Sequence, residues 1–205
     1  FAYGQHLSIQ KEVSPKISVL VELGDRYQYD SQLTPFQKFV RAGVGLKLRQ
    51  SHVTMAGYAY FFNYTKNIFG SEHRYWMQYA FSGNIKTVKV SFRYRPECRW
   101  LDFERNSSSM FNIRNRVLFL AAFPLTRNKL SCLVGNEIFI NTFLINEINH
   151  FDQNRLMIGL DYVYSNNLTF SILYQYMIVR PVYSQTYVVL HPILLVVRFN
   201  FKNKN

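Results

Sequence analysis

Charged side chains occupy alternate positions in the segment Val88 to Trp100, VKVSFRYRPECRW. The charged residues are Lys89, Arg93, Arg95, Glu97 and Arg99. The planar guanidinium group of arginine binds a carboxylate or a phosphate through two parallel N–H donors. This row of residues therefore has the chemistry either to form ion pairs with carboxylates or to bind an anion.

A β-strand is the element that would place these charged residues together, because successive side chains of a strand point to opposite faces. The intervening residues are mostly apolar: Val88, Val90, Phe92, Tyr94, Cys98 and Trp100. The same alternation recurs in NRLMIGLDYVYS and at the end of the chain, where one face carries Ile193, Leu195, Val197, Phe199 and Phe201. The sequence therefore predicts a sheet with one apolar and one polar face.

About eleven segments follow this pattern. They span 2–10, 16–29, 37–49, 53–65, 71–83, 86–101, 110–124, 129–142, 151–165, 168–180 and 186–201. Most have about 12–15 residues, whereas strands of soluble sheets have about 5–6 and a strand that crosses a bilayer needs about 9–11. Their length predicts an all-β fold, a single antiparallel transmembrane β-barrel of about 10–12 strands.

The connections between these segments also alternate in length. EVSP, RQSH, SGNI, PLTRN and SNN are short, whereas DSQLTPF, LDFERNSSSM and LINEINH are longer and more polar. Outer-membrane barrels have short periplasmic turns and longer outer loops. Bacterial barrels of one chain also have an even number of strands, so an odd count leaves three explanations: a segment upstream of Phe1, a miscounted strand, or an unusual closure.

Composition supports one folded domain over residues 1–205. The 205 residues are 48% apolar and include 15 Tyr and 18 Phe, which favours sheet over helix. The formal charge of +12 suits an anionic partner, but the basic residues follow alternating strands and no nucleic-acid-binding motif accompanies them, so we expect no nucleic-acid partner. A soluble β-sandwich or a lipocalin-like barrel is disfavoured, because such an interior would not collect so many arginines.

A set of segments, taken in order, resembles an uncharacterised family of Gram-negative outer-membrane β-barrels that is classed only as a domain of unknown function. The segments are EHRYWMQYAF, VSFRYRPECRW, IRNRVLFL, GNEIFIN and FDQNRLMIGLDYVYSNNLTFSILYQY. The resemblance implies the fold and a bacterial outer-membrane location, but no activity. It singles out Glu72, His73, Arg74, Trp76, Gln78, Arg93, Arg95, Glu97, Arg99, Arg114, Arg116, Asn136, Glu137, Gln153, Asn154 and Arg155.

Twelve polar residues share the parity expected for the barrel lumen. They are Glu72, Arg74, Gln78, Arg93, Arg95, Glu97, Arg99, Arg114, Arg116, Glu137, Arg155 and Asp161. Because charges inside a small barrel must be paired or hydrated, we expect either an Arg–carboxylate network that closes the lumen or an anion-binding interior.

Three functions remain open. We favour a non-enzymatic barrel that is structural or an accessory subunit of a larger outer-membrane assembly. A small anion-selective pore or anion-binding barrel is the alternative, because the predicted lumen has more arginine than carboxylate. A lipid-modifying enzyme with His73 as its base is disfavoured, because Glu72 and His73 point to opposite faces of one strand and no serine in NSSSM is placed to act with them.

The remaining expectations concern ligands and partners. The five histidines lack the spacing of metal ligands, so we expect neither a metal site nor a cofactor. Cys98 and Cys132 are interpreted as small apolar residues. Outer-membrane lipids and lipopolysaccharide are the expected lipid partners, because basic residues at the barrel rims would pair with their phosphates.

Overall fold

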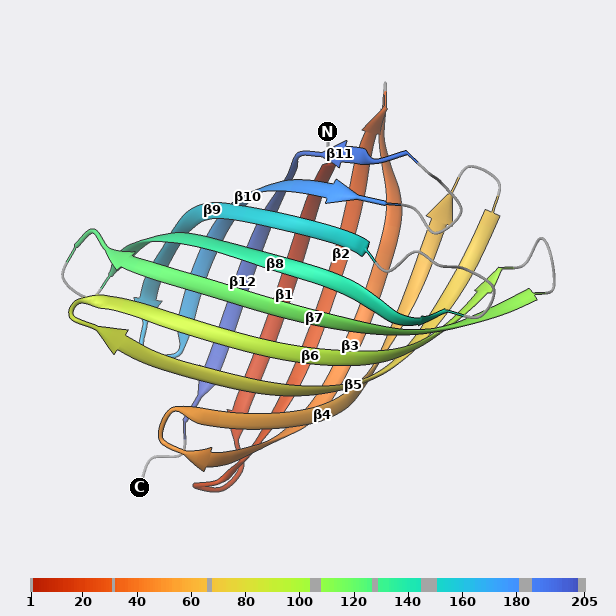
Figure 1. Cartoon of the computed structure of the whole chain (residues 1–205). Helices are drawn as coiled ribbons and strands as arrows, with labels where there is room; N and C mark the ends of the chain where they lie inside the picture. The colour runs from red at the N-terminus through yellow and green to blue at the C-terminus, as the bar shows by residue number, and fades with distance from the viewer. Residues whose placement is uncertain are drawn as a thin grey trace.

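The described part of the chain forms a β-barrel in which every regular element is a strand (Figure 1). A computed structural model describes residues 2–30, 32–65, 68–103, 108–126, 129–144, 151–180 and 186–202. The strands are β1 (Ala2–Glu12), β2 (Ile17–Asp30), β3 (Gln32–Arg49), β4 (His52–Thr65), β5 (Ile68–Ile85), β6 (Val88–Phe103), β7 (Ser108–Pro124), β8 (Leu130–Leu144), β9 (Phe151–Ser165), β10 (Leu168–Val179), β11 (Val188–Leu190) and β12 (Pro192–Phe201). In the described part of the chain, no helix is long and apolar enough to cross a membrane.

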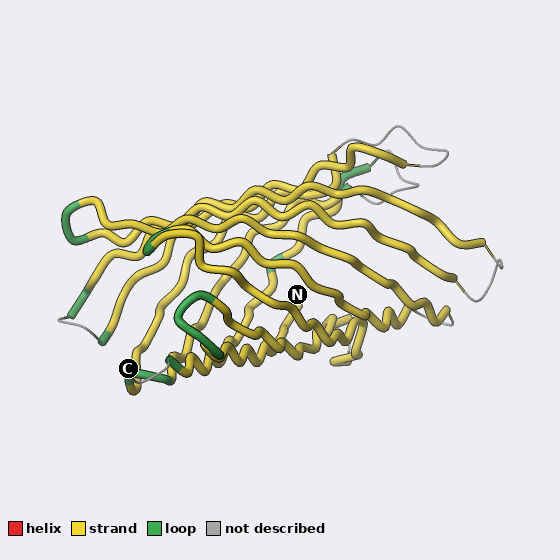
Figure 2. The backbone as a smooth tube through the Cα atoms, turned by 90° about the horizontal axis from the view of Figure 1, so that it is seen from below, coloured by secondary structure: helices red, strands yellow, loops and turns green. Residues whose placement is uncertain are grey.

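The barrel wall has eleven strand positions, which confirms the predicted fold class. The short β11 and the longer β12 pair with β10 in a single register, Met177 opposite Leu190 and Tyr174 opposite Ile193, and only His191 interrupts them. They therefore fill one position in the wall. Neighbouring strands along the rest of the chain pair in antiparallel fashion, and Figure 2 shows the continuous wall that they form.

The odd strand number is resolved by an unusual closure. The first and last strands, β1 and β12, lie side by side and pair in parallel, with Leu7 opposite Val197 (Figure 1). The described strands thus close on one another without a further strand, and each of the eleven positions in the wall is paired on both sides.

The connections at one end of the barrel are short, as predicted. Strands β3 and β4 are joined by Gln50 and Ser51, and β5 and β6 by Lys86 and Thr87. Lys86 adopts a left-handed φ of 55°, which lets a two-residue turn reverse the chain. This turn replaces the one expected at SGNI, because β5 continues to Ile85.

The loop expected at DSQLTPF at the other end is instead largely part of a long hairpin. Asp30 pairs with Gln32, so β2 and β3 run almost into each other. A register shift between Arg26 and Tyr27 places Pro35 opposite Tyr27. Such a bulge accommodates a proline, which has no N–H for the ladder. Parts of the other two predicted loops, 104–107 and 145–150, lie outside the described residues.

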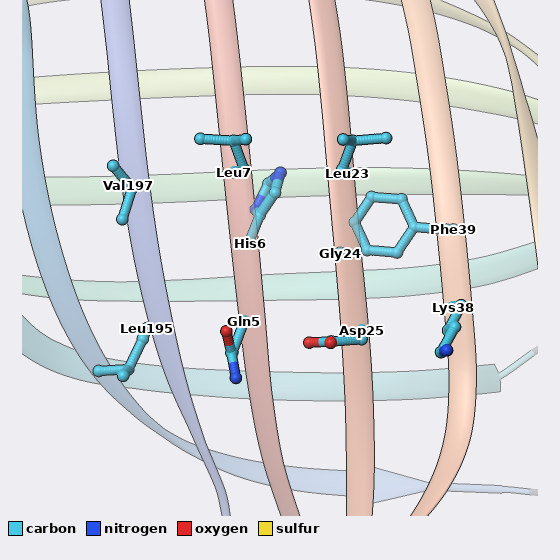
Figure 3. A pocket seen from close by; sticks show the side chains of 10 residues that line it. All are labelled: Gln5, His6, Leu7, Leu23, Gly24, Asp25, Lys38, Phe39, Leu195 and Val197. Atoms are coloured by element: carbon cyan, nitrogen blue, oxygen red, sulfur yellow. The ribbon is translucent and has the colours of Figure 1, made fainter.

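The outer wall is apolar and aromatic. Met77 and Phe119 are exposed outward, and a belt of touching rings crosses four strands near the end opposite the short turns. In this belt the ring centroids are 5.2 Å apart for Tyr58 and Tyr75, 5.5 Å for Tyr75 and Trp100, and 4.8 Å for Trp100 and Phe111. Aromatic belts of this kind lie at the interfaces of membrane-spanning barrels. Elsewhere, a shallow hollow interrupts the outer wall where β12, β1, β2 and β3 lie side by side (Figure 3).

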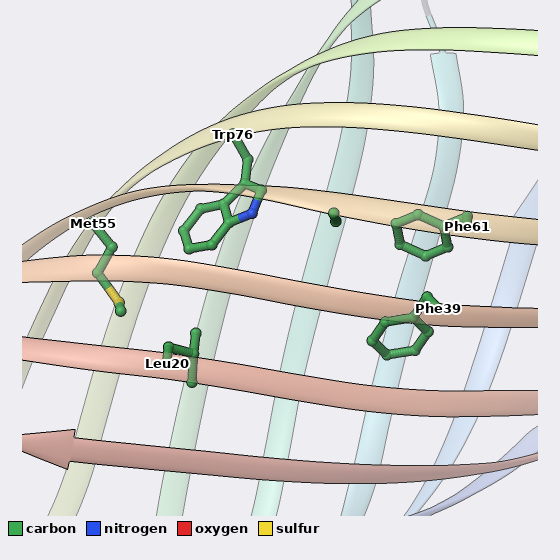
Figure 4. Packing of buried hydrophobic residues seen from close by; sticks show 6 residues of the cluster. Leu20, Phe39, Met55, Phe61 and Trp76 are labelled. Carbon is green, nitrogen blue, oxygen red and sulfur yellow. The ribbon is translucent and has the colours of Figure 1, made fainter.

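The inside of the barrel also contains a compact aromatic cluster. Leu20, Phe39, Met55, Phe61 and Trp76 pack together from β2 to β5 (Figure 4), and the rings of Phe39 and Phe61 stack 5.1 Å apart. The indole of Trp76 lies against Gly43 and Gly57, where a Cβ atom would come within 2.6 Å of the ring. The interior is therefore packed with aromatic side chains as well as charged ones, which the strand parity alone did not predict.

The parallel closure predicts a specific crosslink. In a chain carrying Cys98→Ser and Cys132→Ser, the pair Leu7→Cys with Val197→Cys should form a disulfide on oxidation, because these residues are opposed in the closing ladder. The pair Leu7→Cys with Phe199→Cys is the control, displaced by two residues and too far apart to bridge. Non-reducing electrophoresis and mass spectrometry detect the disulfide. Crosslinking of the displaced pair in preference to the opposed one would contradict the closure.

Candidate functional site

Nine of the twelve predicted lumen residues form one continuous network on the inner faces of β5 to β9. Its members are Glu72, Arg74, Arg93, Glu97, Arg99, Arg114, Arg116, Glu137 and Arg155. The network exists because neighbouring strands place these residues in register. Glu97 lies opposite Arg114, and Glu137 lies opposite Arg155.

Glu97 is the centre of this network, which we call the lumen network. Arg114 Nη2 donates to Glu97 Oε2 at 2.6 Å, and Arg116 Nη1 donates to Oε1 at 2.8 Å. Arg74 Nη1 lies 3.8 Å from Oε2. The residue is 1% exposed, so this carboxylate depends on its three arginine neighbours in place of water.

Two further carboxylates extend the lumen network to either side. Glu72 accepts a bidentate pair from Arg74, Nε to Oε1 at 2.7 Å and Nη2 to Oε2 at 2.8 Å, and it also accepts from Arg99 Nε. Glu137 Oε1 accepts from Arg93 Nη2 at 2.6 Å and from Arg116 Nη2 at 2.9 Å. Because Arg116 contacts both Glu97 and Glu137, and Arg74 contacts both Glu72 and Glu97, the three carboxylates are linked through shared cations.

The other three predicted lumen residues have separate partners. Gln78 Oε1 accepts from Arg95 Nε at 2.9 Å, and Asp161 Oδ1 accepts from Arg198 Nη2 at 2.6 Å. Arg95 therefore lies in the lumen with an amide as its hydrogen-bond partner, and Asp161 belongs to a second ion pair on β9 and β12.

Buried aromatic rings lie beneath the guanidinium groups. The guanidinium carbon of Arg74 is 3.5 Å from the centroid of the Phe61 ring, and those of Arg116 and Arg155 are 4.6 and 4.5 Å from the Phe139 ring. Phe139 is 0% exposed. Stacking on a ring stabilises a cation and leaves the N–H edge of the guanidinium free to meet an anion.

Several lumen residues were not among those predicted from the sequence. Glu22 accepts from Arg41 Nη1 at 2.7 Å and lies 3.3 Å from His6 Nε2, and Asp152 accepts from Arg114 Nη1 at 2.9 Å. The parity of β2 and β3 carries a signal for Glu22 and Arg41, because each alternates with outward apolar residues. No such signal exists for Asp152, which is buried next to buried Gln153.

The lumen contains a cavity of about 740 Å³, a volume in the range of small-molecule sites. Residues from β1 to β10 and from β12 line it, including Arg26, Arg41 and Arg155. Its lining reaches Gln28 and Tyr64 near the end opposite the short turns. The network and this cavity together define a polar interior that is able to hold an anion.

The residues considered for catalysis are not brought together. Glu72 points into the lumen, whereas His73 lies on the outer wall, where its Nδ1 is 2.6 Å from the hydroxyl of Tyr58. Residues 106 and 107 of the NSSSM motif lie outside the described residues. Among the residues that the structure describes, no group of three or more His, Cys, Asp or Glu side chains is arranged to hold a metal ion.

Comparison with known proteins identifies the class of this chain and then its family. The fold is similar to the translocator domain of the autotransporter NalP from Neisseria meningitidis, with a TM-score of 0.53 and 13% identity over 87% of this chain and 72% of that chain. The chain belongs to the family described as protein of unknown function DUF2490, whose model matches residues 5–183. The predicted family resemblance is thus confirmed. No curated protein matches the chain.

Neutralising the central carboxylate is expected to destabilise the barrel. Glu97→Gln removes the buried carboxylate that Arg114 and Arg116 share, so we expect a loss of about 3–5 kcal/mol in the free energy of unfolding. Urea unfolding in lipid vesicles, followed by tryptophan fluorescence, measures it. Asp102→Asn, at an exposed position on the same strand, is the control and should change stability by less than about 0.5 kcal/mol. Equal stability of both variants would contradict a structural role for Glu97.

Proposed function

We propose that this protein is a non-enzymatic β-barrel of the bacterial outer membrane, with a closed lumen, that serves as a structural or accessory subunit of a larger outer-membrane assembly. The observation that carries the proposal is the lumen network, in which Glu72, Glu97 and Glu137 are only 1–3% exposed. The location is supported by the apolar outer wall, the aromatic belt and the similarity in fold to an outer-membrane translocator domain.

The packing of the lumen supports a barrel that does not conduct. The network braces the inner faces of β5 to β9, and Trp76 and Phe61 fill the space next to β3 and β4. Toward the short turns, Leu133, Leu173 and Val196 form a second apolar cluster. An ion that crossed this interior would have to separate paired charges and pass an apolar layer.

The hollow in the outer wall is the surface that we propose for a protein partner. Gln5, Asp25 and Lys38 lie in one cross-strand row there, beside the apolar Leu195 and Val197 (Figure 3). Tyr27 donates to Asp25 Oδ2 at 3.2 Å, while Asp25 Oδ1 is buried with no hydrogen-bond partner among the described residues. A carboxylate on a wall that otherwise faces lipid is costly, and a partner that donates to it would remove this cost.

Lipid phosphates are the second class of partner that we propose. Basic residues gather at the end of the barrel with the short turns: Lys11, Lys16, Lys47, Arg49, Lys86, Lys89, Lys129 and Lys202. This end would face the periplasmic leaflet, where the lysines would meet phospholipid headgroups. Lipopolysaccharide would contact the opposite rim, near which Lys38 of β3 is exposed.

The accessory role predicts a partner that depends on the hollow. Extraction of native membranes in mild detergent should yield the barrel with a stoichiometric protein partner, identified by mass spectrometry. Asp25→Asn should lower the amount of that partner several-fold, because it removes the charge in the hollow, and Asp102→Asn should leave it unchanged. A barrel that always elutes alone from native membranes would contradict the accessory role.

A small anion-selective pore is the second candidate, favoured by the excess of arginine over carboxylate around the lumen cavity. Planar-bilayer recording of the purified barrel separates the two candidates. We expect no unitary conductance from the closed lumen. Reproducible anion-selective steps that change in Arg93→Gln would instead support the pore and overturn the closed lumen.

A further inference from the structure

The charges around the lumen cavity do not balance. Ten arginines line it: Arg26, Arg41, Arg74, Arg93, Arg95, Arg99, Arg114, Arg116, Arg155 and Arg198. Four carboxylates line it: Glu22, Glu72, Glu137 and Asp152. Glu97 and Asp161, which pair with lining arginines, raise the number of carboxylates to six. Ten cations against six anions leave four positive charges in an interior enclosed by an apolar wall, where uncompensated charge is costly.

Among the described residues, three of these arginines have no carboxylate within hydrogen-bonding distance. Arg26 Nη1 donates to Gln37 Oε1 at 2.7 Å, and Arg95 donates to Gln78. Arg155 Nη1 is 4.0 Å from Glu137 Oε2. The near partners of Arg26 and Arg95 are neutral amides, which satisfy an N–H donor but leave the positive charge uncompensated.

Guanidinium groups from strands that are far apart in the wall line one cavity. Arg26 on β2, Arg41 on β3, Arg116 on β7 and Arg155 on β9 all belong to its lining. Arg26 and Arg41 also lie against the same ring, that of Phe39. An anion in this cavity would lie between cations from several strands and would reduce their mutual repulsion.

Aromatic rings lie beside three of these guanidinium groups. The guanidinium carbons of Arg26 and Arg41 lie 5.9 and 5.6 Å from the centroid of the Phe39 ring, and Arg155 lies over Phe139 at 4.5 Å. The Nε atom of Arg41 is buried and has no hydrogen-bond partner among the described residues. These groups are thus oriented before any ligand arrives, which lowers the entropic cost of binding.

The cavity reaches only one end of the barrel. Gln28, Asn63 and Tyr64 line it near the end opposite the short turns. Toward the short turns its lining includes the apolar Leu120, Leu133 and Val196 together with Arg198, and none of the described turn residues lines it. A soluble ligand would enter from the end opposite the short turns and stop at this largely apolar floor, and lipids are separated from it by the closed wall.

We propose that the lumen is a binding site for a soluble, multiply charged anion of the phosphate type, held by Arg26, Arg41 and Arg155 with Arg95 nearby. Guanidinium groups bind phosphate oxygens through paired donors, and several fixed cations favour a polyanion over chloride. The site rests on the closed lumen of the proposed function, but it does not require a protein partner.

Calorimetric titration of the folded barrel in neutral detergent with pyrophosphate, and separately with inorganic phosphate, tests this site. We expect saturable binding of one pyrophosphate per barrel, and binding at least tenfold weaker in Arg26→Gln and in Arg155→Gln. Arg26→Lys keeps the charge but loses the paired donors, so its affinity for pyrophosphate should lie between those of the unaltered protein and Arg26→Gln. Arg49→Gln, on the rim with the short turns, is the matched control and should bind as the unaltered protein does.

The outcomes separate this inference from the function proposed above. Absence of pyrophosphate binding to the unaltered barrel overturns the site, and so does equal affinity in all variants, which would place binding at the lysine-rich rim. The mobility shift of each variant on heating in detergent verifies that it is folded. If a glutamine variant does not fold, protection of the unaltered barrel against heat by pyrophosphate, but not by chloride at equal ionic strength, decides the question. Bilayer conductance and partner capture, which test the proposed function, are measured in separate experiments, so either result can fail without the other.

Discussion

Buried arginines inside an apolar wall are the constraint on which the rest of this structure depends. A guanidinium cation cannot be left alone in an enclosed interior, so each carboxylate must serve several arginines at once. Glu97 does this for Arg114 and Arg116, and Arg116 links it to Glu137. Each of these contacts needs adjacent strands in the correct register, so the network also fixes the alignment of β6, β7 and β8.

The closure of the barrel also keeps the apolar outer face and the polar inner face of the wall separate. A shift of one residue in any strand pair would turn charged side chains toward the outside. The parallel pairing of β1 and β12 keeps Leu7 and Val197 on the outer wall and leaves His6 and Val196 inside. An odd number of strands is thus compatible with a continuous two-faced wall, provided that the first and last strands run in the same direction.

The interior stabilises its arginine cations in two ways. Carboxylates pair with the arginines of β5 to β7 other than Arg95, whereas aromatic rings and amides support those at the margin of the network, such as Arg26 and Arg155. This division makes the lumen rigid at its centre and electropositive next to the cavity. Membership of a family of unknown function and a fold similarity at 13% identity supply the architecture. The features that bear on function are this charge distribution and the hollow around Asp25.

Strand periodicity alone predicted the class of fold, a count of about 10–12 strands and the face on which most charges lie, because this periodicity is a local property of consecutive residues. The alternation around Glu97 was sufficient to predict an inward charged row. The partners of these charges follow only from the folded barrel, because the shared cavity that Arg26 of β2 and Arg155 of β9 line depends on curvature and register summed over many strands. The same holds for the role of Phe139, because its ring supports cations only once the arginines of neighbouring strands cover it.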